Sequence, residues 1–195
     1  MASVDYNRSL GASTQSGWAG PAAPSRQAHR TEQGDPHPVP STIGLISDTH
    51  GLLRASAMRA LEGVALIVHA GDVGNRDVLF ELAALAPVHA VHGNVDDPHV
   101  PELAGHRWLS VEGWRVHVSH GHEVGRPSPA LLLRRYPEAG LLVFGHTHRA
   151  VVHREGARLV VNPGAAGPRR FDVTPSVARV TLSPGQAEVE IVPID

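Results

Sequence analysis

The chain of 195 residues contains no cysteine, which excludes disulfide bonds, thiolate metal sites and a cysteine nucleophile. Any metal ion must therefore be held by nitrogen and oxygen ligands, chiefly imidazole and carboxylate groups. Lysine is absent as well, so all 17 basic residues are arginine. We attribute this absence to genomic composition bias, because it affects the whole chain and not one site.

The chain also lacks a strong net charge and a long apolar run. Its formal net charge of -2 and its hydrophobic content of 42% are typical of a soluble globular protein without the basic field that binds nucleic acid nonspecifically. No apolar run approaches the length of a membrane span, and the first residues do not resemble a secretory signal. We expect a cytoplasmic protein with no membrane association and no stable nucleic-acid binding, which leaves nucleic acid open as a substrate.

The composition changes near residue 40. Residues 1–40 are rich in Ser, Gly, Ala, Pro and Gln and have no sustained apolar period, so they cannot bury enough surface to offset the entropy of ordering. We expect a disordered N-terminal tail over 1–40 and one domain over 41–195, which is a usual domain length. The tail sequence DPHPVP could bind a partner as an extended polyproline segment, but an untethered tail is the favoured interpretation.

From Thr42 onward, short apolar runs alternate with helical patterns. This alternation predicts parallel strands within 42–47, 65–72 and 88–94 that are joined by helices within 52–63 and 76–86. The remaining sequence predicts three hairpins, over 106–122, 150–164 and 176–194. It also predicts one short helix over 128–136 and one more buried strand over 141–148. Two packed sheets with helices on the outside would cover all these apolar faces.

Polar residues follow the predicted strands at their carboxyl ends, where ligands bind in open α/β sheets. They are Asp48, His50, Asp72, Asn94, His120, His122, His146 and His148. Together they offer about enough nitrogen and oxygen ligands for two metal ions with shared coordination. Single motifs are weak evidence in a chain with 14 histidines, and Asp35 to His37 repeats the Asp-x-His spacing within the predicted tail. The order of the motifs, each at the end of an apolar strand, is what favours a common site.

The ordered motifs resemble those of the calcineurin-like metallophosphoesterases. They are SDTHG at 47–51, GD at 71–72, GN at 93–94, SHGH at 119–122 and GHTH at 145–148. The resemblance is greatest to the small bacterial phosphodiesterase branch, which is also similar to the retromer scaffold subunit of eukaryotes, and NPG at 162–164 matches a turn of this branch. The resemblance covers roughly residues 42–193 and implies an α/β fold, a four-layer αββα sandwich of two mixed sheets.

The resemblance also implies a dinuclear metal site and its ligands. The first metal ion would be held by Asp48, His50, Asp72 and His148. The second would be held by Asp72, Asn94, His120 and His146, with Asp72 bridging the two ions. Manganese is the expected metal, and iron, zinc and nickel are alternatives because such ligands accept several first-row ions. Catalytic roles are expected for Asp72, Asn94 and His120.

This set of ligands fits the hydrolysis of phosphate esters, most of all phosphodiesters. Two divalent cations about 3.5 to 4 Å apart acidify a bridging water, and the resulting hydroxide can attack phosphorus in line with the leaving group. A bridging carboxylate offsets part of the repulsion between the cations, while the amide of Asn94 adds no further negative charge. The GHTH turn would direct His146 and His148 to different metal ions, with Gly145 letting the backbone bend.

One position departs from the pattern of the broader family. Phosphatases of that family often have a histidine that protonates the leaving alkoxide, whereas GNVDD has Val95 there. Valine cannot donate a proton, so good leaving groups such as aryl oxides should be favoured. Asp96 and Asp97 are candidates for an acid or a supporting role, although an exposed turn is the favoured interpretation.

Four other polar residues near the motifs receive supporting roles. His69 and His92 are expected in the core or behind the metal ligands. His122 is expected to lie behind His120, with contact to phosphate as the alternative. Asn75 is expected to cap the helix that follows it.

Residues further from the motifs receive structural interpretations. His117 and His153 lie within predicted hairpin strands and are expected to be ordinary surface or edge residues. Arg169 and Arg170 could bind phosphate, because guanidinium binds such oxyanions well, but a solvated turn is the favoured interpretation.

Two functions of different classes stay open. The first is a metal-dependent phosphodiesterase, and the second is a metal-binding scaffold that binds a protein partner. Competent side chains at all seven expected ligand positions favour the enzyme. The substrate is not determined, and cyclic nucleotides, glycerophosphodiesters, nucleic-acid ends and monoesters are all compatible with these motifs. An exposed edge strand could pair two copies, so a homo-oligomer is also possible.

Overall fold

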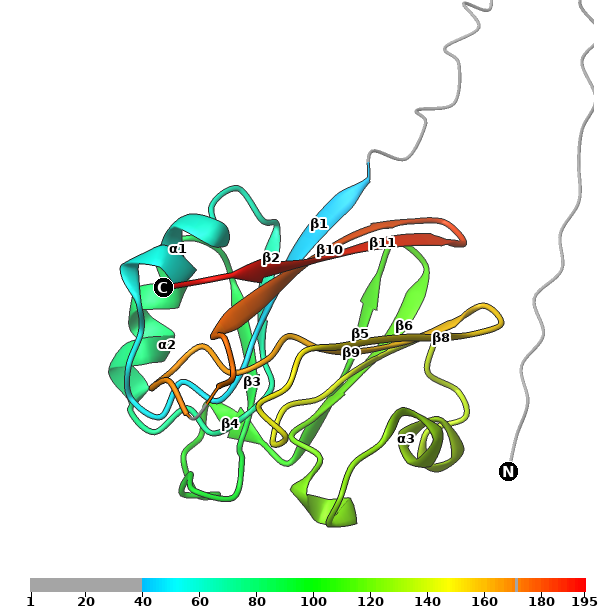
Figure 1. The fold of residues 1–195 in the computed structure, drawn as a ribbon. Coiled ribbons are helices and arrows are strands. Elements are labelled where there is room, and N and C mark those ends of the chain that lie inside the picture. Colours follow the sequence, from blue (N-terminus) through cyan, green and yellow to red (C-terminus); the bar gives the residue numbers. More distant parts are fainter. Residues whose placement is uncertain (1–39, 171) are drawn as a thin grey trace, which may run out of the picture. The chain divides into compact units, whose positions relative to one another are not determined.

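The computed structural model describes residues 40–170 and 172–195, so the tail predicted over 1–40 lies outside the described residues except for Pro40. Two mixed sheets pack face to face, with helices on their outer sides (Figure 1). The predicted αββα sandwich is therefore confirmed. Within the described residues, no helix is long and apolar enough to cross a membrane.

The first sheet, sheet A, has the strand order β11-β10-β1-β2-β3-β4. Its strands are β1 (Ser41–Ile46), β2 (Leu66–His69), β3 (Val88–Val91), β4 (Leu103–Ala104), β10 (Ser176–Ser183) and β11 (Gln186–Pro193). Strands β1 to β4 pair in parallel, whereas β10 and β11 are antiparallel to their neighbours. The parallel pairing places the carboxyl ends of β1, β2 and β3 at the same edge of the sheet.

The second sheet, sheet B, has the strand order β5-β6-β7-β9-β8. Its strands are β5 (His106–Val111), β6 (Trp114–Ser119), β7 (Leu141–Val143), β8 (Val151–Glu155) and β9 (Arg158–Asn162). The central strands β6, β7 and β9 are parallel, and the two edge strands are antiparallel to them. The carboxyl ends of β6 and β7 therefore also lie together.

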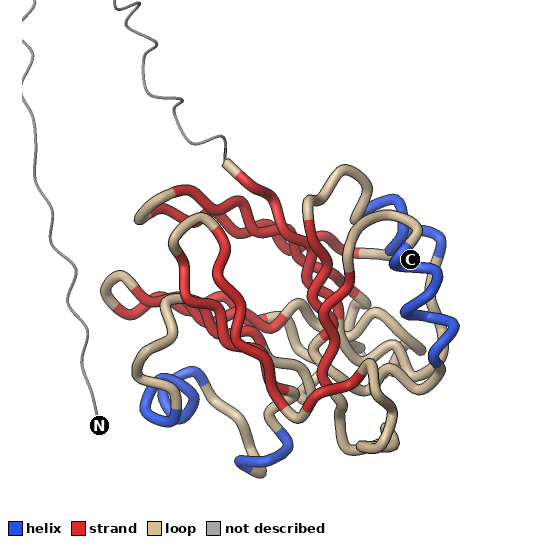
Figure 2. The backbone as a smooth tube through the Cα atoms, turned by 180° about the vertical axis from the view of Figure 1, so that it is seen from behind, coloured by secondary structure: helices blue, strands red, loops and turns tan. Residues whose placement is uncertain are grey.

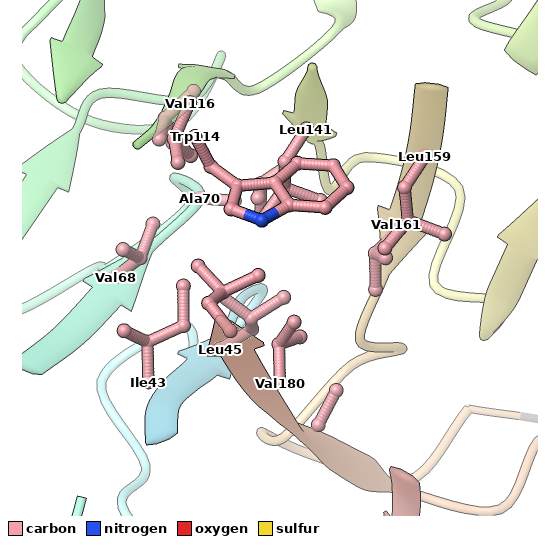
Figure 3. Close-up of a cluster of buried hydrophobic side chains, with 14 of the residues drawn as sticks. Ile43, Leu45, Val68, Ala70, Trp114, Val116, Leu141, Leu159, Val161 and Val180 are labelled. Carbon is pink, nitrogen blue, oxygen red and sulfur yellow. The ribbon is translucent and has the colours of Figure 1, made fainter. Parts of the chain in front are cut away.

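The largest apolar core fills the space between the sheets. Ile43, Leu45 and Val180 of sheet A face Trp114 and other apolar residues of sheet B (Figure 3). Two smaller cores lie on the outer faces: α1 (Ala55–Ala60) and α2 (Arg76–Ala83) cover sheet A, and α3 (Pro129–Arg135) covers sheet B (Figures 1 and 2). The seven-residue helix α3 begins after Ser128, whose side chain accepts a hydrogen bond from the backbone N–H of Leu131.

The sequence predicted every major element, but not all of their limits. The helix predicted over 52–63 is the shorter α1, which has no side-chain cap at its start and reaches Gly63, with a φ of 74°, soon after its end. The two-residue strand β4 and the short 3₁₀ helix η1 (His122–Val124) were not predicted, because both are too short to show a periodic pattern.

His117 lies in an aromatic cluster on the outer face of sheet B, together with Trp108 and Tyr136. Its side chain is fully buried, and the centre of its ring lies 3.6 Å from that of Tyr136 and 4.7 Å from that of Trp108. The prediction that His117 is a surface or edge residue was therefore wrong: β6 lies inside the sheet, and Tyr136 covers the ring. His153 lies on the edge strand β8 and is partly exposed, as predicted.

Burial, with a smaller contribution from His106, lowers the pKa of His117 to about 4. The unfolded chain, in which this pKa is about 6.5, binds more protons between those values, so His117 reduces stability as the pH falls through that window. Between pH 6.5 and 4, the free energy of unfolding of metal-free protein should fall less in His117→Phe than in the wild type. The difference between the two decreases should be up to about 3 kcal/mol. Urea unfolding at several pH values measures this difference.

The matched control for this prediction is His153→Phe, which makes the same change at a partly exposed edge position. Its pH dependence should follow that of the wild type. Parallel curves for His117→Phe and the wild type would show that His117 does not titrate below its ordinary range.

Candidate metal centre

The carboxyl ends of five strands bring the predicted ligands to one edge of the sandwich. In sheet A, Asp48 and His50 follow β1, Asp72 follows β2 and Asn94 follows β3. In sheet B, His120 directly follows β6, and His146 and His148 follow β7. Backbone hydrogen bonds tie these loops together, such as those from Asp48 N to Gly71 O (3.0 Å) and from Gly145 N to His120 O (3.1 Å).

The first group of ligands comes together as predicted. Asp48, His50, Asp72 and His148 each present one donor atom, and these atoms all lie within 4.8 Å of one another. The Nε2 atoms of His50 and His148 are 3.5 Å apart, and His148 Nε2 lies 3.2 Å from Asp48 Oδ1. Two carboxylates and two imidazoles thus surround a single point.

The second group is linked in pairs next to the first. His120 Nε2 lies 3.4 Å from Asp72 Oδ1, and His146 Nδ1 donates a hydrogen bond of 3.0 Å to Asn94 Oδ1. The rings of His120 and His146 meet edge to face, with their centres 5.2 Å apart. The four side chains predicted around the second metal are therefore linked by pairwise contacts, whereas within the described residues only the first group has all its donor atoms within 4.8 Å of one another.

Asp72 faces both groups with different oxygen atoms. Its Oδ2 lies 3.8 Å from His50 Nε2 in the first group, while its Oδ1 faces His120 in the second. Burial alone would raise the pKa of Asp72, but the contacts with His120, the backbone N–H of Val95 and His50 lower this pKa to about 2. The side chain is therefore a carboxylate over the physiological pH range.

Five of the seven predicted ligands have a left-handed backbone. Their φ angles lie between 48° and 66°, and the residues are Asp48, His50, Asp72, His146 and His148. Among the described residues, Glu112 in a hairpin turn is the only other non-glycine with a positive φ. Such a conformation costs roughly 1 kcal/mol or more at each residue and persists where the surrounding structure enforces it.

The expected role of Gly145 needs correction. We expected this glycine to let the backbone bend, but the left-handed residues of the GHTH turn are His146 and His148. Gly145 is required for space instead: a Cβ there would lie 2.8 Å from Ala70 O and 2.9 Å from Asp48 Oδ2. The strand β7 can approach the Asp48 loop only because this residue has no side chain.

Buried polar residues hold the ligand loops in place. Ser47 Oγ donates to Asp48 Oδ2 (2.6 Å), which leaves Asp48 Oδ1 free to face His148. Asn162 donates through Nδ2 to the backbone O of Gly145 (2.8 Å) and to Thr147 Oγ1 (3.1 Å), so it fixes the GHTH turn. Asn162 begins the NPG turn and was not predicted to have a role, although it is a polar residue at a strand end, as Asn94 is.

Asp96 has a supporting role that we did not favour. Its carboxylate accepts hydrogen bonds from the backbone N–H groups of Val73 (3.0 Å), Gly74 (2.8 Å) and Gly93 (2.8 Å). These bonds join the loop after Asp72 to the loop before Asn94. The favoured interpretation of Asp96 as part of an exposed turn was wrong, whereas Asp97 is exposed as expected.

The histidines near the ligands differ in their surroundings. His69 is buried, its Nε2 lies 2.9 Å from Thr49 Oγ1, and burial lowers its pKa to about 4, so the ring is neutral at pH 7. His92 is partly buried, with Nδ1 3.3 Å from Gly93 O. His122 packs beside His120, with ring centres 5.4 Å apart, but His120 is oriented by its hydrogen bond from Nδ1 to Ala70 O (2.7 Å).

The predicted helix cap at Asn75 is confirmed, since its side chain accepts a hydrogen bond from Asp77 N of 3.0 Å.

Arg169 and Arg170 are exposed, but Arg170 is not simply solvated. Its Nη2 lies 3.5 Å from His50 Nε2, next to the first group of ligands.

The arrangement of donor atoms fits divalent cations. Asp48 Oδ1 and His120 Nε2 are buried and have no hydrogen-bond partner within residues 40–170 and 172–195. Because His120 Nδ1 donates to Ala70, the other ring nitrogen, Nε2, faces the negatively charged Asp72. Burial alone would lower the pKa of His120, but the contacts with Asp72 and Ala70 O raise it, so a proton on Nε2 is favoured. Without that proton, Nε2 would present its lone pair to a carboxylate. Two such groups repel each other unless a proton or a cation lies between them, and buried polar atoms without partners are costly.

Comparison with known proteins agrees with this geometry. Residues 42–185 match the calcineurin-like phosphoesterase superfamily domain. A probable metallophosphoesterase of Methanothermobacter thermautotrophicus is 36% identical over 155 residues, which cover 75% of this chain and 90% of the relative. The phosphodiesterase YfcE of Escherichia coli strain K12 is 34% identical over 145 residues, covering 61% of this chain and 76% of the relative.

Solved structures share the fold at lower sequence identity. Vacuolar protein sorting 29 from Cryptosporidium parvum superimposes with a TM-score of 0.67 at 20% identity and covers 80% of this chain and 98% of its own. A structure described as a novel archaeal phosphodiesterase has a TM-score of 0.61 at 21% identity, with 77% of this chain and 99% of its own covered. The same fold therefore occurs both in a vacuolar sorting protein and in a phosphodiesterase.

Gly93 is a sensitive position in this centre, because a Cβ there would lie 2.0 Å from Asp72 Oδ1 and 2.4 Å from Asp72 N. Gly93→Ala should lower the free energy of unfolding by about 1–3 kcal/mol and weaken Mn²⁺ binding by displacing Asp72. The control is Gly105→Ala, whose Cβ would have His92 Nε2 at 3.5 Å as its nearest neighbour. Urea unfolding and calorimetric titration with Mn²⁺ measure both effects; equal stability and equal Mn²⁺ affinity of the two variants would contradict this prediction.

Proposed function

Because the chain belongs to the calcineurin-like phosphoesterase superfamily, we propose that it is a metal-dependent phosphodiesterase with a dinuclear centre. The observation that carries the proposal is the position of Asp72, whose two carboxylate oxygens face two separate groups of nitrogen and oxygen ligands. A carboxylate with one oxygen toward each of two ligand groups is suited to bridge two cations.

The ligand assignment follows the two groups. The first metal ion would be held by Asp48, His50, Asp72 and His148, and the second by Asp72, Asn94, His120 and His146. Mn²⁺ is the proposed metal, with Fe, Zn or Ni as alternatives that the same donor atoms accept. Two divalent cations bound there would acidify a water molecule and stabilise the negative charge that develops on the phosphoryl group.

Three side chains make this centre suitable for binding metal ions and an anionic substrate. Asp72 supplies shared negative charge between the two groups, since its carboxyl stays ionised. Asn94 adds an oxygen without charge, so the exposed side of the second group does not repel an anionic substrate. His120 is held by Ala70 in the orientation that directs Nε2 into the centre, so little reorganisation is needed when substrate binds.

The leaving group receives no proton from the position after Asn94. Val95 lies there, and its side chain is 54% exposed at the edge of the centre. Substrates whose leaving group departs readily as an anion, as aryl oxides do, should therefore react fastest. This favours activated diesters over simple alkyl esters.

A scaffold function on the same fold is the alternative. The structural neighbours named vacuolar protein sorting 29 share the fold at about one-fifth identity, which by itself does not choose between the two functions. Ligand completeness favours the enzyme, because all seven positions carry competent side chains and lie together. We propose the cytoplasm as its location and phosphoesters as its substrates; a homo-oligomer is compatible with the exposed edge strands.

Hydrolysis of bis-p-nitrophenyl phosphate by metal-stripped protein, before and after addition of Mn²⁺, tests the proposed function. We expect turnover only with metal, and faster turnover of this diester than of p-nitrophenyl phosphate. Asp72→Ala and His146→Ala should each lower kcat by more than about 100-fold, because loss of even an outer partner of a metal ligand commonly costs 10- to 100-fold.

The control is His153→Ala, which removes a histidine from the edge strand β8 and should leave turnover unchanged. Circular dichroism would verify that all variants are folded. Unchanged turnover in both Asp72→Ala and His146→Ala would rule out this site as the origin of the activity, and no turnover in protein that binds metal would favour the scaffold function.

A further inference from the structure

An open pocket with two arginines lies directly beside the metal centre. It has a volume of about 280 Å³ and is lined by His146, Thr147, His148, Arg149, Arg170 and Val173. Two of these residues are predicted metal ligands, so the pocket continues from the centre towards solvent. Among the described residues, its lining includes two guanidinium groups and no carboxylate, which gives this side of the centre a positive charge.

Hydrogen bonds hold the segment that carries Arg170 against the loop after β1, which contains two of the predicted metal ligands. The backbone N–H of Gly167 donates to Asp48 O (3.1 Å), and Arg54 donates to Gly167 O from Nε and Nη2. A Cβ at Gly167 would lie only 2.2 Å from Thr49 O, so the close approach of this segment requires a glycine. The backbone leading to Arg170 is thereby fixed next to the loop that follows β1.

The hydrogen bond of Arg170 uses the same lone pair that a metal ion needs. A guanidinium group can only donate, so its contact of 3.5 Å with His50 Nε2 points an N–H at the lone pair of the neutral ring. That nitrogen also faces His148 Nε2 at 3.5 Å and Asp72 Oδ2 at 3.8 Å. A cation bound among these atoms would occupy the lone pair and repel the guanidinium, which would then be free to bind an anion in the pocket.

We propose that Arg170 and Arg149 form a subsite for a second phosphoryl group of the substrate, next to the phosphodiester that is hydrolysed. This inference rests on the proposed function and adds a substrate class: phosphodiesters that carry another phosphate. Two dications, the carboxylates of Asp48 and Asp72 and the hydroxide nucleophile leave a charge of about +1, which a diester monoanion balances, so the two arginines add positive charge beyond what that diester needs. Guanidinium groups bind phosphate through paired hydrogen bonds, which makes them suitable for this recognition.

Two substrates that differ by one phosphate test the proposal. They are the p-nitrophenyl ester of thymidine 5′-phosphate and the same compound with an additional 3′-phosphate. We expect the Mn²⁺-loaded enzyme to have the higher kcat/KM for the 3′-phosphorylated ester. In Arg170→Gln, the ratio of the two kcat/KM values should fall by about tenfold, the effect of roughly 1.4 kcal/mol.

Arg126→Gln is the matched control, because Arg126 is exposed outside this pocket and should leave the ratio unchanged. Arg149→Gln should lower the ratio in the same direction as Arg170→Gln. An unchanged ratio in both pocket variants would overturn the proposal, even if both substrates became slower, since it would place these arginines at the scissile phosphate or in solvent.

A binding measurement separates this proposal from the proposed function. Calorimetric titration of Mn²⁺-loaded protein with thymidine 5′-phosphate and with thymidine 3′,5′-bisphosphate requires no turnover, so its result stands even if no ester is hydrolysed. The subsite predicts that the preference for the bisphosphate is severalfold smaller in the double variant Arg149→Gln, Arg170→Gln than in the wild type and in Arg126→Gln. Equal preferences in all three proteins would overturn it.

Discussion

The centre of this protein depends on the position of one carboxylate, that of Asp72. Strand β2 lies in the middle of the parallel part of sheet A, between β1 and β3, so the residue after its end lies between the loops of both neighbours. From there Asp72 reaches His50 with one oxygen and His120 of the opposite sheet with the other. The packing of the two sheets thus determines whether the two groups of predicted ligands can share this carboxylate.

The loops around Asp72 keep a conformation that short peptides avoid. Five of the predicted ligand positions are left-handed, and hydrogen bonds from residues outside the predicted ligand set hold them in place. Asp96 joins the loops after β2 and β3, and Asn162 fixes the turn after β7. Strained backbone that is held by its surroundings is typical of preorganised functional sites, and here it directs side chains from both sheets to one place.

The sequence predicted the fold and the gathering of the ligands, because apolar periodicity determines the strands and parallel strands end at one edge. It could not predict contacts made between distant segments. His117 was misjudged because alternation along β6 indicates which face a residue lies on, but not that Tyr136 covers that face. Asp96 was misjudged for a similar reason, since its partners lie on a separate loop. The pairing of Arg170 with His50, 120 positions apart in the chain, was equally beyond a local pattern.

In the proposed dinuclear centre, one carboxylate serves two metal ions. Anomalous diffraction from crystals of the Mn²⁺-loaded protein tests it most directly. We expect two anomalous peaks about 3.5 to 4 Å apart with Asp72 between them, the first beside Asp48, His50 and His148 and the second beside Asn94, His120 and His146. A single peak in crystals saturated with Mn²⁺, or two peaks that do not share Asp72, would contradict it.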